Sequence, residues 1–132
     1  MSMNPWIVLV TAAALILYLL ATLNVATTRK KHGLMPPAMS GHPAVERAVR
    51  AQANTLEWLT LFLPSLWMFY PFWGAYLAAG LGVLWIAGRA LYVIGYLKDP
   101  ERRYPGFFIQ LLVVVILLIG VAVGAIRALM AG

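Results

Sequence analysis

Two groups of polar side chains recur at three- and four-residue spacing in a chain that is otherwise strongly apolar. The first group comprises Glu46, Arg47, Arg50, Asn54 and Glu57. The second group comprises Arg89, Tyr92 and Tyr96. Residues three and four apart share one face of an α-helix, so each group is expected to line one helix face. Charged groups at membrane depth are costly unless they are paired or lie in a polar cavity, so both groups indicate a functional site.

The first group forms a ladder of donors and acceptors that suits a zwitterionic, peptide-like ligand. In this interpretation Arg50 binds a carboxylate, Asn54 an amide and Glu57 an ammonium group. A purely structural alternative is that Arg50 and Glu57 form a salt bridge that holds helix against helix. The salt bridge alone would leave the second polar group without an explanation.

The second group includes an arginine that should lie inside the membrane. An unpaired arginine facing lipid is strongly disfavoured, so we expect Arg89 to pair with Glu57 or Glu46 from a neighbouring helix. Tyr96, near the end of the same helix, is equally compatible with an ordinary residue of the interfacial aromatic belt.

Two arginines follow at the membrane surface, Arg102 and Arg103. Such a pair either orients the protein in the bilayer or stabilises a bound thiolate, which is the reactive form of a thiol. The chain has no cysteine, so a thiol must come from the ligand. His32 and His42 lack a carboxylate or cysteine partner at metal-ligand spacing, so we expect no metal site.

The composition is that of an integral membrane protein. Hydrophobic residues make up 63% of the 132 residues, whereas about 45–50% is typical of soluble domains. Three long tracts carry no charge, and each can cross the hydrocarbon, which takes about 20 residues; they are 2–28, 58–88 and 104–126. The basic cluster 29–31 follows the first tract, so this tract is expected to be a retained span rather than a signal peptide.

These tracts predict a single all-α domain, residues 1–132, built as an integral membrane four-helix bundle. The helices are expected at about 5–27, 43–69, 75–97 and 105–129. Residues 70–74 (Y-P-F-W-G) read as a tight aromatic turn between the second and third helices. Nearly all basic residues lie by the first and third connections, which places those connections in the cytoplasm and both termini outside. The net charge of +6 therefore indicates membrane orientation and not nucleic-acid binding.

Residues 45–57 (V-E-R-A-V-R-A-Q-A-N-T-L-E) resemble the second-helix signature E-R-x-x-R-A-x-x-N-x-x-E of the MAPEG family. That family comprises membrane-associated proteins in eicosanoid and glutathione metabolism. Residues 88–96 (G-R-A-L-Y-V-I-G-Y) look like its third-helix motif, followed by an arginine-bearing loop. The resemblance covers nearly the whole chain in order and spacing, and two separated motifs in one topology are a specific signal.

The resemblance implies a homotrimer of four-helix subunits with glutathione bound between subunits. It also implies which residues contact glutathione: Arg50, Gln52, Asn54, Glu57, Tyr92 and Tyr96, with Arg29 contributed by a neighbouring subunit. Arg103 aligns with the arginine that activates the thiol in leukotriene-C synthase-like members, and Arg102 is one position away. Two departures are Trp58, where those members have a ligand-binding tyrosine, and Lys30, which replaces a second arginine.

The expected function is that of a membrane-bound glutathione transferase or peroxidase acting on lipophilic electrophiles, with membrane lipid as its surroundings. The compact chain resembles bacterial members, which implies the bacterial inner membrane and an active site facing the cytoplasm. One alternative is a lipid-binding member without catalysis. A second is a small multidrug transporter, but transporters of that class carry their essential glutamate in the first helix, which here has no charge.

Overall fold

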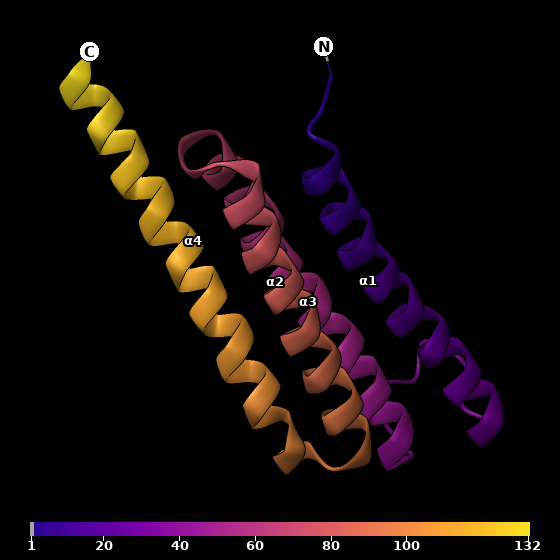
Figure 1. Cartoon of the computed structure of the whole chain (residues 1–132). Coiled ribbons are helices and arrows are strands. Elements are labelled where there is room, and N and C mark those ends of the chain that lie inside the picture. Colours follow the sequence, from indigo (N-terminus) through magenta and orange to yellow (C-terminus); the bar gives the residue numbers. More distant parts are fainter. Residues whose placement is uncertain (1) are drawn as a thin grey trace.

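The computed structural model describes residues 2–132, and every regular element in that range is helical. The elements are α1 (Pro5–His32), α2 (Pro43–Trp73), α3 (Ala75–Lys98), the short 3-10 helix η1 (Pro100–Arg103) and α4 (Tyr104–Ala131). The four long helices run up and down side by side, with α1 and α4 flanking α2 and α3 (Figure 1). The prediction of an all-α helical bundle is confirmed.

The first helix extends five residues beyond its predicted end. The Asn4 side chain begins α1 by accepting hydrogen bonds from the backbone N–H groups of Trp6 and Ile7. The helix continues through the basic residues to His32 and ends at Gly33, whose φ of 68° is left-handed. Cations are favourable in the last turn of a helix because the carbonyl end of the dipole is negative, so the basic cluster belongs to α1 itself.

The predicted aromatic turn at residues 70–74 is wrong, because α2 continues through Pro71 to Trp73. Contacts with α4 hold this last turn: the indole Nε1 of Trp73 donates to the Gly120 carbonyl oxygen at 2.8 Å. Tertiary packing therefore outweighs the local tendency of proline to interrupt a helix. Only Gly74, with φ 96°, separates α2 from α3.

Three segments are long and apolar enough to cross a membrane: Pro5–His32, Ala75–Lys98 and Pro100–Ala131. The expectation of four spans is thus confirmed for three. The second helix is long enough, but its first half carries four charged side chains: Glu46, Arg47, Arg50 and Glu57. It nevertheless packs against α1, α3 and α4, so its apolar side is held within the bundle while Glu46, Arg50 and Glu57 stay exposed.

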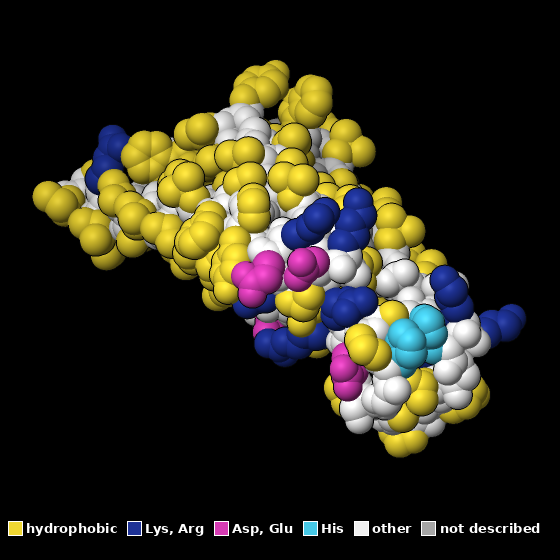
Figure 2. Space-filling view, turned by 90° about the horizontal axis from the view of Figure 1, so that it is seen from below, with side chains coloured by type: hydrophobic (Ala, Val, Ile, Leu, Met, Phe, Trp, Pro, Cys, Tyr) yellow, Lys and Arg dark blue, Asp and Glu magenta, His cyan; other side chains and the backbone are white. Residues whose placement is uncertain are grey.

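The charged side chains gather at the end of the bundle that carries the two longer connections (Figures 1 and 2). Most of the remaining surface in that view is hydrophobic, as expected of a surface in lipid. The buried core lies toward the middle, where the rings of Phe62 and Trp85 stack with centroids 4.1 Å apart. The charged end of the bundle is therefore suited to water, and the rest of the surface in that view is suited to lipid.

The approach of α3 to α4 depends on Gly106. A Cβ atom at this position would overlap the backbone nitrogen of Tyr92 and the carbonyl oxygen of Gly88. Neither backbone atom can move without displacing α3. The bare glycine therefore sets the distance between the helix that carries the tyrosines and the helix that follows Arg103.

We expect Gly106→Ala to lower the midpoint of thermal unfolding in detergent, with a cost of about 1–3 kcal/mol from overpacking. Gly80→Ala is the matched control, because a Cβ there meets nothing within 4 Å and alanine favours a helix by roughly 0.5–1 kcal/mol. Circular dichroism on heating measures both variants. A Gly106→Ala protein as stable as the control would contradict the close packing.

Candidate functional site

Five of the predicted site residues line one cavity of about 330 Å³. They come from α2, α3 and η1, and Phe107 of α4 completes the lining; the residues are Arg50, Asn54, Tyr92, Tyr96, Arg103 and Phe107. The helical spacing places Arg50 and Asn54 one turn apart on α2, and the two tyrosines one turn apart on α3. The cavity therefore forms where the polar faces of the two middle helices meet.

The tyrosines form a continuous aromatic wall of this cavity. The rings of Tyr92 and Tyr96 are stacked, with centroids 5.8 Å apart and planes inclined by 5°. The Arg103 guanidinium lies beside them, with its Cζ 5.9 Å from the Tyr96 centroid. An aromatic wall beside a cation can hold a ligand in place while the cation acts on its charge.

Arg103 is held at the cavity by the short helix in which it lies. Its Nη1 donates to the Pro100 carbonyl oxygen at 2.6 Å, and its Nη2 donates to the Tyr104 hydroxyl at 3.0 Å. Arg102 is exposed and does not line the cavity. Successive residues of a 3-10 helix point about 120° apart, which is why one arginine faces the cavity and its neighbour does not.

Glu57 lies beside the cavity rather than in its lining. Its Oε1 is 3.6 Å from the Arg50 Nη1, and both side chains are more than half exposed, at 57% and 58%. The salt bridge considered as a structural alternative thus exists, but it joins two residues of α2 and holds no two helices together. Exposed pairs of this kind contribute about 0–1 kcal/mol, so a ligand can displace this one.

Arg29 and Gln52 line a separate cavity of about 580 Å³ beside α1 and the connection that follows it. Gln52 Nε2 donates to the Thr22 hydroxyl at 3.2 Å, and Arg29 donates to the Ala38 carbonyl oxygen. Gln52 is two residues from Asn54, about 200° around the helix, so it lies on the opposite face of α2. A single chain therefore does not bring these two residues to the site.

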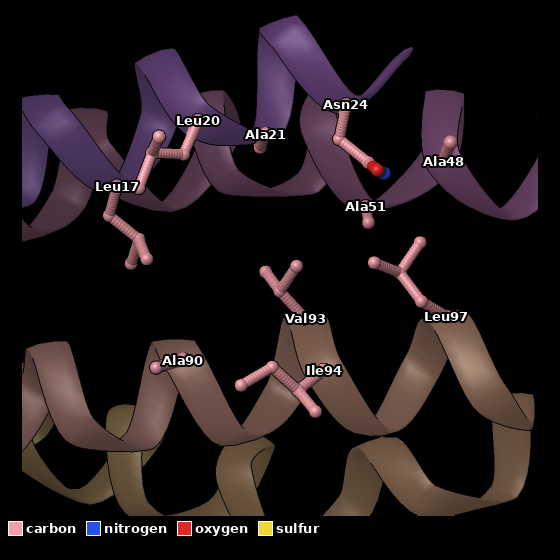
Figure 3. A pocket seen from close by; sticks show the side chains of 10 residues that line it. All are labelled: Leu17, Leu20, Ala21, Asn24, Ala48, Ala51, Ala90, Val93, Ile94 and Leu97. Atoms are coloured by element: carbon pink, nitrogen blue, oxygen red, sulfur yellow. The ribbon is translucent and has the colours of Figure 1, made fainter. Parts of the chain in front are cut away.

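A third cavity, of about 230 Å³, is almost entirely apolar and lies between α1 and α3 beside α2 (Figure 3). Ala90 and Ile94 line it from α3, each two residues from Tyr92 and so on the far side of that helix. Asn24 is the one polar side chain among its lining residues. Within one chain, this apolar space and the polar cavity open on different sides of α3.

The predicted partner of Arg89 is wrong. This arginine is fully buried, and its Nη1 donates to Asn54 Oδ1 at 2.8 Å and to Gln110 Oε1 at 3.1 Å. Glu46 and Glu57 are exposed instead. Neutral amides can accept a hydrogen bond from a buried guanidinium without the cost of desolvating a second charge.

Sequence reasoning missed two residues that matter here, Phe107 and Gln110. Phe107 lines the cavity, and its ring meets Trp58 edge-on with centroids 5.9 Å apart. An aromatic side chain in an apolar tract gives no signal of its own. Gln110 did give one, because it is the only amide in the charge-free tract 104–126, and polar side chains in a span usually bind another helix.

Comparison with known proteins finds a family and several relatives that match most of the chain. The MAPEG family model matches residues 7–123. An uncharacterised protein of Synechocystis sp. is 45% identical over 115 residues, covering 87% of this chain and 84% of its own. Microsomal glutathione S-transferase 2 of Homo sapiens is 36% identical over 102 residues, with 77% and 69% covered. Leukotriene C4 synthase of Rattus norvegicus is 34% identical over 94 residues, with 71% and 63% covered.

The fold and these similarities define an α-helical integral membrane protein. The chain belongs to the MAPEG family. The family resemblance found in the two sequence motifs is thereby confirmed.

Proposed function

We propose that this protein binds glutathione in the cavity lined by Arg50, Asn54, Tyr92, Tyr96 and Arg103, and transfers it to lipophilic electrophiles. One observation carries the proposal: two guanidinium groups, an amide and two phenols share a single cavity of about 330 Å³. Glutathione has two carboxylates, an ammonium, two amides and a thiol, and these groups match that set. Relatives named glutathione S-transferase and leukotriene C4 synthase support the choice of ligand.

Arg103 has the catalytic role in this proposal. Its guanidinium stabilises the thiolate of glutathione, whose proton leaves to solvent. The sulfur then attacks an electrophilic carbon: a carbon–sulfur bond forms, and a leaving group departs with the electron pair of the bond that breaks. With a peroxide the same thiolate would attack oxygen, so a peroxidase activity uses the same residues. Arg102 is exposed and has no part in this step.

The other site residues position the tripeptide. Arg50 binds a carboxylate and Glu57 the ammonium, and their exposed contact at 3.6 Å opens when glutathione enters. Tyr92 and Tyr96 pack against the bound ligand. Holding the thiol against Arg103 in this way lowers the entropic part of the barrier.

We further propose that the active form is a homotrimer, because Arg29 and Gln52 then gain a role. In one chain these residues lie in a different cavity, on the opposite face of α2. In a ring of three, that face of one subunit can meet the glutathione cavity of the next. Each site would then combine Arg103 of one subunit with Arg29 of another.

The placement in the membrane follows from the same arrangement. The cavity lies near the charged end of the bundle (Figure 2), so glutathione enters from water, and the positive-inside bias makes that side the cytoplasm. The electrophile enters from the bilayer. We propose that the host membrane is the bacterial inner membrane, with both termini on its outer side.

Glutathione-agarose in detergent tests the proposal. We expect the protein to be retained, to elute with free glutathione, and to conjugate chlorodinitrobenzene with release of chloride. Arg50→Gln should weaken retention about tenfold or more, because a charge-assisted contact is lost. Failure of the wild-type protein to bind would favour the lipid-binding member without catalysis, and binding without turnover of any electrophile or peroxide would remove the transferase assignment.

A further inference from the structure

Arg89 lies directly behind the proposed glutathione cavity but does not line it. Its side chain is fully buried between α2, α3 and α4, and its Cζ is 3.9 Å from the centroid of the Tyr92 ring. Both Asn54 and Tyr92, which it contacts, do line the cavity. The guanidinium is therefore one layer removed from a bound ligand and acts on it only through other side chains.

The direction of the hydrogen bond between Arg89 and Asn54 follows from the chemistry of the two groups. A guanidinium only donates hydrogen bonds, so the amide atom 2.8 Å from Arg89 Nη1 must be the oxygen. By the same reasoning, the Gln110 amide atom that lies 3.1 Å from Arg89 Nη1 is its oxygen. Arg89 thus engages the oxygen of the Asn54 amide, which leaves its nitrogen as the group available to donate to a ligand.

We infer that Arg89 is a positioning residue that turns the Asn54 amide so that its nitrogen donates into the cavity. This inference rests on the proposed function and deepens it. With Arg50 and Arg103 also donating, the cavity presents mainly donors and selects a ligand rich in acceptors, such as a carboxylate or a peptide carbonyl. Asn54 therefore recognises a ligand oxygen and not an N–H group.

Arg89 can orient the Asn54 amide and also hold neighbouring helices together. It binds Gln110 of α4 and Asn54 of α2 through one nitrogen, which joins three helices. Among the described residues its Nε and Nη2 have no acceptor, so the two amide oxygens are the acceptors on which it depends. Removing one of them should therefore be costly in a buried setting.

Asn54→Asp separates the positioning role from helix packing. The new carboxylate keeps an acceptor for Arg89 and so keeps the helices joined, but it replaces the nitrogen donor with a second oxygen. We expect the unfolding temperature in detergent to be maintained and the glutathione affinity, measured by calorimetry, to fall about tenfold or more. If the amide oxygen faced the ligand instead, the variant would keep that acceptor, and unchanged or higher affinity would overturn the inference.

Gln110→Glu is the matched control, because it adds the same charge beside the same arginine but lies outside the cavity lining. We expect it to retain glutathione affinity within about threefold of the wild-type protein. An equal loss in both variants would mean that the buried charge, and not the orientation of the amide, reduces binding, and would overturn the inference.

A third variant tests the contact without any ligand. Asn54→Leu leaves Arg89 with one acceptor, so its unfolding temperature should fall clearly below that of Asn54→Asp. Equal unfolding temperatures would show that Arg89 does not depend on Asn54, and would also overturn the inference. If the wild-type protein failed to bind glutathione, the proposed function would be wrong. The unfolding temperatures of Asn54→Asp and Asn54→Leu would still show whether Arg89 depends on Asn54.

Discussion

Replacing Arg103 with glutamine should abolish most of the conjugating activity while glutathione still binds. At pH 7 a thiol with an ordinary pKa near 8.5 is only about 3% thiolate. A guanidinium contact of roughly 1.5–3 kcal/mol lowers that pKa by about one to two units. The variant should therefore turn over chlorodinitrobenzene about 10- to 25-fold more slowly at neutral pH, with little change in the dissociation constant of glutathione.

The pH dependence distinguishes thiol activation from simple loss of structure. Without Arg103 the thiol keeps its ordinary pKa, so the rate of the variant should rise about tenfold per pH unit below pH 8.5 and approach the wild-type rate above it. Arg102→Gln is the matched control, because it makes the same change at an exposed residue outside the cavity. Equal losses in the two variants, or a loss that persists at high pH, would contradict the role given to Arg103.

Two variants that each turn over slowly at neutral pH should recover activity when they assemble together. Arg103→Gln damages the cavity on one side of α2, and Arg29→Gln damages the separate cavity on the other side. If each site combines the first cavity of one subunit with the second cavity of its neighbour, random co-assembly of equal amounts yields about one intact site in four. Purification on two different tags keeps only mixed trimers, and each mixed trimer has one intact site in three, so we expect the co-purified protein to recover about a third of wild-type turnover.

The control for this experiment pairs two substitutions within one cavity. Arg103→Gln co-assembled with Asn54→Asp should show no recovery, because neither chain supplies an intact first cavity. Recovery in the control pair would point to subunit exchange artefacts, and no recovery in the first pair would place Arg29 outside the site. Either result would contradict a site shared between subunits.

Much of the fold was predictable because membrane helices are marked by composition and length. The first and last charge-free tracts lie almost entirely within α1 and α4, and the middle tract covers the second half of α2 and the first half of α3. The ends were less predictable: Pro71 favours a turn locally, yet the bond from Trp73 to Gly120 holds the last turn of α2. Such contacts join residues 47 positions apart, and no local pattern encodes them.

The candidate site was predictable from helical spacing where its residues share a helix. Arg50 and Asn54, and Tyr92 and Tyr96, meet as their four-residue spacing requires. Spacing could not choose the partner of Arg89, because several acceptors were available on neighbouring helices and the interior selected the uncharged ones. Nor could it separate Arg102 from Arg103, since that depends on the local turn of η1.

We propose that one cavity between the polar faces of α2 and α3 holds glutathione with its thiol against Arg103. An experimental density map of the protein in lipid with bound glutathione tests this directly. We expect a tripeptide beside Tyr92 and Tyr96, with its sulfur in contact with the Arg103 guanidinium and a carboxylate on Arg50. Glutathione density elsewhere, or a sulfur directed away from Arg103, would contradict it.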